Sequence, residues 1–189
     1  MLVNCEAEFD GFIDRMHLLG EKLSPLLLQF PFLNKYAYEI QVDEFSVRLR
    51  FFLGRLKDLT PCRFAVEIRN KARLDKRLTD LLREHNVALA LTDLSNIMPR
   101  PWELKDGLDL VTADFVYVRW LADRNGIEAL TTTWDKTVID RTEDLRNWAG
   151  LFRQLVSRNL KVYAYANNHC AGHGPGTVKL FWDTFSGQR

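Results

Sequence analysis

Long hydrophobic runs are missing from this sequence of 189 residues. The longest apolar stretch, around residues 26–32, is too short and too interrupted to cross a bilayer, which takes about 20 apolar residues. The first residues contain neither a basic region nor the apolar core of a secretory signal. These absences argue against a membrane protein and against export.

Cysteine and net charge are also low. The three cysteines, Cys5, Cys62 and Cys170, are an odd number with no C-x-x-C spacing, which argues against a disulfide framework or a zinc site. This usage is typical of a reducing cytoplasm, and we expect a cytoplasmic protein. The net charge of +1 gives no indication of a nucleic-acid or acidic-membrane partner. No glycine-rich G-x-G-x-x-G follows a predicted strand, so a dinucleotide-binding fold has no support.

Strand-like and helix-like segments alternate along the whole chain. Apolar runs predict strands near 23–30, 64–69, 87–93, 114–120 and 160–166, and apolar stripes at helical spacing predict helices near 9–19, 45–56, 74–82, 145–156 and 177–185. Near-continuous apolar strands are typical of parallel sheets covered on both faces. The sequence therefore predicts one α/β domain over residues 1–189.

Polar residues stand at the C-terminal end of each predicted strand: Gln29, Glu67, Arg69, Asp93, Arg119, Asn167 and Asn168. Parallel strands bring these ends to one edge of the sheet, where β/α barrels bind their ligands. We expect Glu67 and Asp93 to act as general acid and base, and Arg69 and Arg119 to hold phosphate or carboxylate. The alternative is that these residues cap loops and pair with one another, Glu67 and Arg69 as a structural ion pair.

The segment after the last strand is rich in hydrogen-bonding side chains and glycine. We expect Asn167, Asn168 and His173 to orient a ligand, and the glycines at 172–176 to let backbone N–H groups approach an anion at the start of the next helix. His169 and His173 have the i,i+4 spacing of metal ligands on a helix. The glycines argue against a helix there, so we predict no metal site, and no motif identifies a cofactor.

Four stretches together carry a family resemblance, at residues 19–31, 64–70, 112–119 and 167–175. They resemble domain-of-unknown-function family 72, also called YecE-like. The resemblance implies a TIM-type β/α barrel whose biochemical function is not established. A complete barrel takes about 250 residues, and this chain begins near the family's third helix. We therefore expect an incomplete barrel that lacks its N-terminal part, with five parallel strands that correspond to family strands 4 to 8 and with flanking helices.

An incomplete barrel has consequences for stability. The strands around Leu26 and Tyr163 would be open edges, which pair readily with other chains. Inward residues such as Ala65 and Leu91 would lose their cover and meet water. We therefore expect the 189-residue chain to self-associate.

The resulting functional hypothesis is a YecE-like barrel protein that binds or converts a small anionic or polyhydroxylated ligand, such as one containing phosphate, at the C-terminal rim of its strands. Two alternatives stay open: a nucleic-acid-binding or nuclease-like barrel, and a non-catalytic truncated fragment. No membrane partner is expected. The residues leave open whether the protein is an enzyme.

Overall fold

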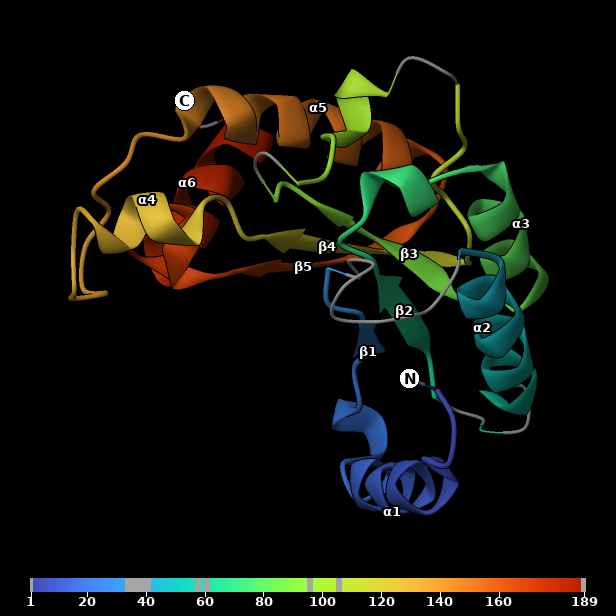
Figure 1. Ribbon diagram of the computed structural model, residues 1–189. Helices are drawn as coiled ribbons and strands as arrows, with labels where there is room; N and C mark the ends of the chain where they lie inside the picture. The colour runs from blue at the N-terminus through green and yellow to red at the C-terminus, as the bar shows by residue number, and fades with distance from the viewer. Residues whose placement is uncertain are drawn as a thin grey trace.

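Strands and helices alternate through the described chain, as Figure 1 shows. The computed structural model describes residues 2–32, 42–56, 59, 62–94, 97–104 and 107–187. The strands are β1 (Leu26–Gln29), β2 (Phe64–Glu67), β3 (Ala88–Thr92), β4 (Phe115–Trp120) and β5 (Lys161–Ala166). The helices are α1 (Glu6–His17), α2 (Val42–Leu56), α3 (Lys76–Glu84), α4 (Arg124–Glu128), α5 (Thr142–Ser157) and α6 (Gly174–Phe185). Short 3₁₀ helices lie at Gly20–Lys22, Lys71–Arg73, Pro101–Glu103 and Asn168–Cys170. None of the helices in these ranges is long and apolar enough to cross a membrane.

The strands form one sheet in the order β1-β2-β3-β4-β5, and every neighbouring pair is parallel. The strand direction turns steadily across the sheet, from near vertical at β1 to near horizontal at β5 in Figure 1. Parallel pairing fits the apolar runs, because crossover helices cover the strands. The prediction is confirmed: the fold is a curled half-barrel of five parallel strands with flanking helices, an incomplete TIM-type barrel.

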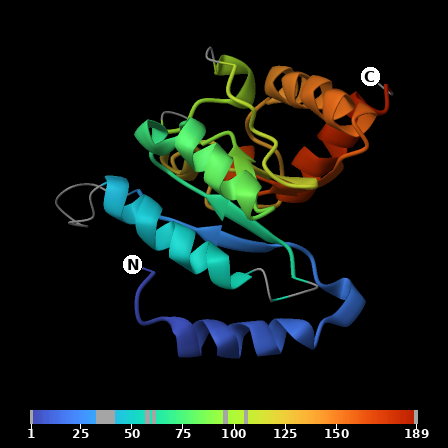
Figure 2. The same ribbon diagram turned by 90° about the vertical axis from the view of Figure 1, so that its right-hand side faces the viewer.

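The main core lies between the convex face of the sheet and the helices. Trp120 of β4 packs against Phe181 of α6 with ring centroids 4.7 Å apart, and Trp148 of α5 is fully buried beside it. Burial of one such large side chain stabilises the fold by about 1.5–3 kcal/mol. At the other end α1 packs along α2 through Phe9 and Phe52, whose centroids are 4.9 Å apart (Figure 2). The convex face is therefore closed by helices.

The concave face has a small core of its own, built from residues of unequal size. Ala65, Ala88 and Ala90 on β2 and β3 pack with Phe115 and Tyr117 on β4. The large rings lie over the small side chains, and all of these residues are buried.

The expectation that Ala65 and Leu91 meet water is wrong, because both side chains are buried. The aromatic rings of β4 pack with Ala65 on the concave face. Leu91 points to the convex face and belongs to the main core. Ala65 is therefore covered on the concave face and Leu91 on the convex face, in both cases by residues of the described chain.

Candidate functional site

A buried carboxylate lies at the C-terminal end of β2, on the concave face. The side chain of Glu67 is 1% exposed and sits between two arginines. Arg69 places Nε 3.0 Å from Oε1, and Arg119 places Nη1 2.5 Å from Oε2. A carboxylate withdrawn from water needs such partners, because its desolvation costs several kcal/mol. The one negative charge of Glu67 therefore faces the two positive charges of Arg69 and Arg119, and the three side chains together carry a formal charge of +1.

Arg119 also reaches Gln29, across the concavity. Its Nη1 donates to Oε1 of Gln29 over 3.0 Å, although β2 and β3 separate β4 from β1. In a flat sheet three strand spacings of ~4.8 Å would hold these strands ~14 Å apart. The sheet must curl for the two side chains to meet. We call Gln29, Glu67, Arg69 and Arg119 the rim cluster.

Two tyrosines lie beside the rim cluster on the same face. Tyr165 is the register partner of Arg119 on β5, and Tyr117 lies two residues before Arg119 on β4. Their rings are stacked, with centroids 5.1 Å apart and 30° between the planes. Burial raises the pKa of Tyr117 to about 12, and the neighbouring Tyr165 adds to the rise. Tyr117 therefore stays a neutral phenol at physiological pH. Its buried ring supports the exposed ring of Tyr165.

Asp93 is not part of the rim cluster. Thr92 has the parity of the concave alanines, and Asp93 follows it with the opposite parity. Its Oδ1 accepts the backbone N–H groups of Leu121 and Ala122 at 2.5 and 3.1 Å, and its Oδ2 accepts Nη2 of Arg141 at 3.0 Å. These contacts hold the segment after β4 against the start of α5. A catalytic role for Asp93 stays a prediction.

The amides after β5 organise their own loop. Asn167 Oδ1 accepts the backbone N–H of His169 at 3.1 Å, and Asn168 Oδ1 accepts the N–H of Gly174 at 2.8 Å. His173 occupies the N-cap position of α6, and its carbonyl accepts from Thr177 at 3.0 Å. Within the described ranges no hydrogen bond or ion pair joins Asn167, Asn168 or His173 to the rim cluster. Their ligand-binding role stays a prediction.

The glycine at 172 has a packing role. Gly172 has φ of +101°, and a Cβ built there would lie 2.7 Å from the carbonyl oxygen of Lys136 and 2.9 Å from Val138. Backbone pairing of Val138 N to Ala171 O, at 2.8 Å, brings the two segments together. The N–H of Gly174 is already donated to Asn168. Packing against the segment after α4 therefore requires a glycine at position 172, and an anion site near this segment stays a prediction.

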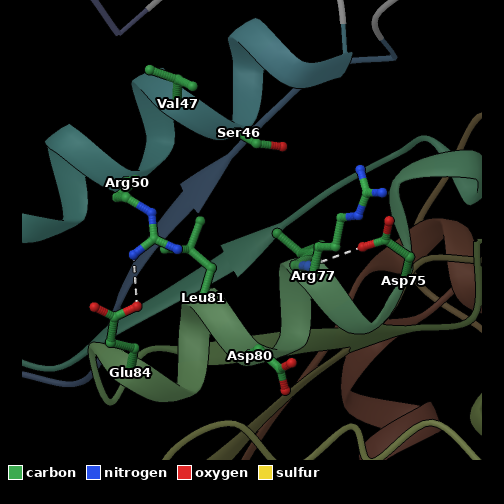
Figure 3. A pocket seen from close by; sticks show the side chains of 9 residues that line it. Ser46, Val47, Arg50, Asp75, Arg77, Asp80, Leu81 and Glu84 are labelled. Carbon is green, nitrogen blue, oxygen red and sulfur yellow. Dashed lines mark hydrogen bonds and ion pairs between the residues drawn. The ribbon is translucent and has the colours of Figure 1, made fainter.

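Surface grooves lie on the helical side of the protein. One of about 490 Å³ runs between α2 and α3, where Arg50 of α2 pairs with Glu84 of α3 at 2.7 Å and Asp75 accepts the backbone N–H of Leu78 (Figure 3). A second, of about 620 Å³, borders α3, and a third, of about 670 Å³, lies between β5 and α6. Asn168 lines the third groove, and none of the three is lined by the rim cluster.

The described ranges contain no group of three or more His, Cys, Asp and Glu side chains placed to hold a metal ion. His169 is held instead by Asn167 at 2.8 Å and by Glu128 at 3.2 Å.

Sequence reasoning missed Arg141, Tyr117 and Tyr165 as partners of the predicted site residues. The alternation of side chains along a strand could have identified the two tyrosines, because Tyr117 lies two residues before Arg119 and therefore on the same face of β4. Arg141 had none, since it lies 48 residues from Asp93 in an irregular segment.

Similar solved structures and a family model show to which family the chain belongs. No curated protein matches the chain. A crystal structure of a DUF72 family protein from Thermotoga maritima is similar, with 19% identity, a TM-score of 0.62, and coverage of 97% of this chain and 65% of that one. One from Enterococcus faecalis has 17% identity and a TM-score of 0.68, and the match covers 97% of this chain and 67% of that one. The chain thus spans about two thirds of the length of these structures. The family described as Protein of unknown function DUF72 matches residues 1–189, and the chain belongs to it.

Proposed function

We propose that the protein binds a small anionic ligand at the rim cluster, on the concave side of the C-terminal strand ends. The observation that supports this is the convergence of two guanidinium groups on one buried carboxylate, with a formal charge of +1 left over. An anionic group on the ligand would balance that charge. The half-barrel fold supports the location, because β/α barrels bind ligands at this edge.

The two arginines differ in how much of each guanidinium is committed. Arg69 engages Glu67 through Nε, and its side chain is 30% exposed. Arg119 engages both Glu67 and Gln29 through Nη1, and its side chain is 20% exposed. Guanidinium forks bind phosphate and carboxylate through parallel N–H bonds, which adds strength and orientation. The remaining N–H groups of both arginines would contact the anion.

The same cluster offers acceptors for a polyhydroxylated ligand. Gln29 and Glu67 would accept hydrogen bonds from hydroxyl groups beside the anion. If the ligand is also converted, Glu67 is the general base of this proposal, since Asp93 lies outside the cluster. A proton would then pass from a ligand hydroxyl to Oε of Glu67 when the ligand draws Arg69 or Arg119 away.

Titration of the full chain with inorganic phosphate tests the proposal. Side-chain Nε resonances of Arg69 and Arg119 would shift with phosphate, whereas an anion at the start of α6 would shift the Gly176 amide instead. Arg69→Gln and Arg119→Gln each lower phosphate affinity by about tenfold, which corresponds to ~1.4 kcal/mol. Arg69→Lys keeps the charge but loses the planar fork, so its loss is smaller.

Arg158→Gln is the matched control, because it removes an exposed arginine at the end of α5. Circular dichroism melts show whether each variant is folded. Phosphate binding that is unchanged in folded Arg69→Gln and Arg119→Gln, or that is lost equally in Arg158→Gln, would contradict the rim site. A folded parent chain that binds neither phosphate nor simple carboxylates would contradict the anionic ligand altogether.

A further inference from the structure

An exposed aromatic ring lies directly beside the proposed anion site. Tyr165 is paired in register with Arg119 on the neighbouring strand, and the residue is 40% exposed. Neighbouring strands lie ~4.8 Å apart. A ligand of ordinary metabolite size can therefore touch both side chains at once.

The ring of Tyr165 is held in place from below. Tyr117 is buried and stacks against it with centroids 5.1 Å apart and an interplanar angle of 30°. Tyr117 is itself packed among the concave alanines and Phe115. A ring supported in this way has lost much of its freedom before any ligand binds, so stacking costs little further entropy.

We propose that the ligand joins its anionic group to a ring with a flat face, with the anion on Arg69 and Arg119 and the ring stacked on Tyr165. This inference rests on the anion site proposed above and names the class of ligand. Cyclic sugar phosphates and nucleoside monophosphates share this chemistry. A pyranose or furanose face packs its C–H groups on an aromatic ring, and a base stacks through its own π face.

Gln29 borders the anion site on the side away from Tyr165. Its side chain lies across the concavity at the guanidinium of Arg119, opposite the β5 side where Tyr165 lies. A ligand anchored at Arg119 thus has an aromatic surface on one side and an amide on the other. A linear alkyl phosphate would fill the anion site alone.

The test compares four probes by calorimetry: inorganic phosphate, glycerol 3-phosphate, glucose 6-phosphate and adenosine monophosphate. The parent chain binds at least one ring-bearing phosphate about tenfold or more tighter than glycerol 3-phosphate, the amount expected of one stacking contact. Tyr165→Leu removes that preference and leaves inorganic phosphate binding unchanged. Tyr165→Phe keeps the preference because it keeps the ring. The two ring-bearing probes show whether a sugar or a base provides the stacked face.

Trp182→Leu is the matched control, because Trp182 is an exposed aromatic on α6, outside the rim cluster. It leaves all four affinities unchanged. Equal binding of ring-bearing and linear phosphates by the parent overturns this inference but leaves the anion site standing. A preference that survives in folded Tyr165→Leu also overturns it. Absence of inorganic phosphate binding by the parent overturns the anion site and this inference together.

Discussion

Arg119 on β4 donates to Gln29 on β1 over 3.0 Å, although two strands separate them in the sheet. The same guanidinium nitrogen contacts Glu67 on β2 at 2.5 Å. One side chain therefore connects three strands across the concavity. Its contribution to stability and its proposed role in binding therefore belong to one guanidinium group, with Nη1 making the contacts between strands.

This coupling predicts strong non-additivity between Glu67 and Arg119. Glu67→Leu leaves two guanidinium groups without their shared carboxylate, and Arg119→Met leaves a buried carboxylate with one partner fewer. Each single variant is destabilised, and the double variant loses less than the sum, with a coupling of about 1–3 kcal/mol. Urea unfolding of all four proteins measures it. The i,i+4 pair of Lys179 and Asp183 on α6, in which the lysine is exposed, is the control, with a coupling of about 0.3–0.5 kcal/mol. Additive losses at Glu67 and Arg119 would contradict the observed contacts.

The buried thiol of Cys170 predicts a loss of stability at alkaline pH. Burial raises the pKa of this thiol to about 12, whereas an unfolded cysteine titrates near ~8.5. Above ~8.5 the unfolded chain loses a proton that the folded chain keeps, so the free energy of unfolding falls as pH rises from ~8.5 towards 12. Tyr117 adds to the fall above ~10, because burial raises its pKa to about 12.

Denaturant melts between pH 7 and 10.5 measure this dependence. Cys170→Ala removes the thiol, so its curve is flatter than the parent's above pH ~8.5. Gly150→Ala on α5 changes no titratable group, so it is the control and leaves the parent's slope unchanged. Parallel curves for the parent and Cys170→Ala would rule out the raised pKa as a contributor.

Gly172→Ala is expected to destabilise the protein by about 2–4 kcal/mol. The positive φ of +101° is strained for any side chain, and the new methyl would lie 2.7 Å from the carbonyl oxygen of Lys136. Gly150→Ala provides the contrast, because Gly150 lies within α5 with open space around its Cβ position. That change stabilises the helix by about 0.5–1 kcal/mol. Thermal melts of the two variants should therefore shift in opposite directions, and a neutral Gly172→Ala would show that the contact with Lys136 is absent.

Self-association is the fourth prediction, and it concerns β5 and α6. β5 ends the described sheet, and Val178 and Trp182 on α6 are exposed beside it along a groove of about 670 Å³. Exposed edges and apolar stripes favour association with other chains. Sedimentation velocity should therefore show concentration-dependent oligomers that Trp182→Glu shifts towards monomer. Leu130→Glu, at an exposed apolar position after α4, should leave the distribution unchanged. A parent chain that is monomeric at all concentrations would contradict the prediction.

The sequence predicted the parallel sheet because the signal is local. Continuous apolar runs such as 64–69 identify covered strands, and the period of two placed Glu67 and Arg69 on one face. The same period also separates Asp93 from Thr92, yet proximity to a strand end alone suggested that Asp93 faces the rim. Contacts between distant segments could not be predicted from local sequence patterns. No residue near Gly172 in the sequence indicates its contact with Lys136, and none near Asp93 indicates its ion pair with Arg141.

The unequal concave core bears on how members of this family can diverge. Ala65, Ala88 and Ala90 lie under the rings of Phe115 and Tyr117, so a larger side chain at any of them would displace an aromatic neighbour. Selection for stability alone would keep those positions small in every descendant that retains the rings. The polar side chains at the strand ends, such as Gln29 and Arg69, do not lie under these rings and are not restricted in size in this way. Substitutions at Gln29, Arg69 or Tyr165 can therefore change the polar edge of the concave face while the alanine layer stays intact.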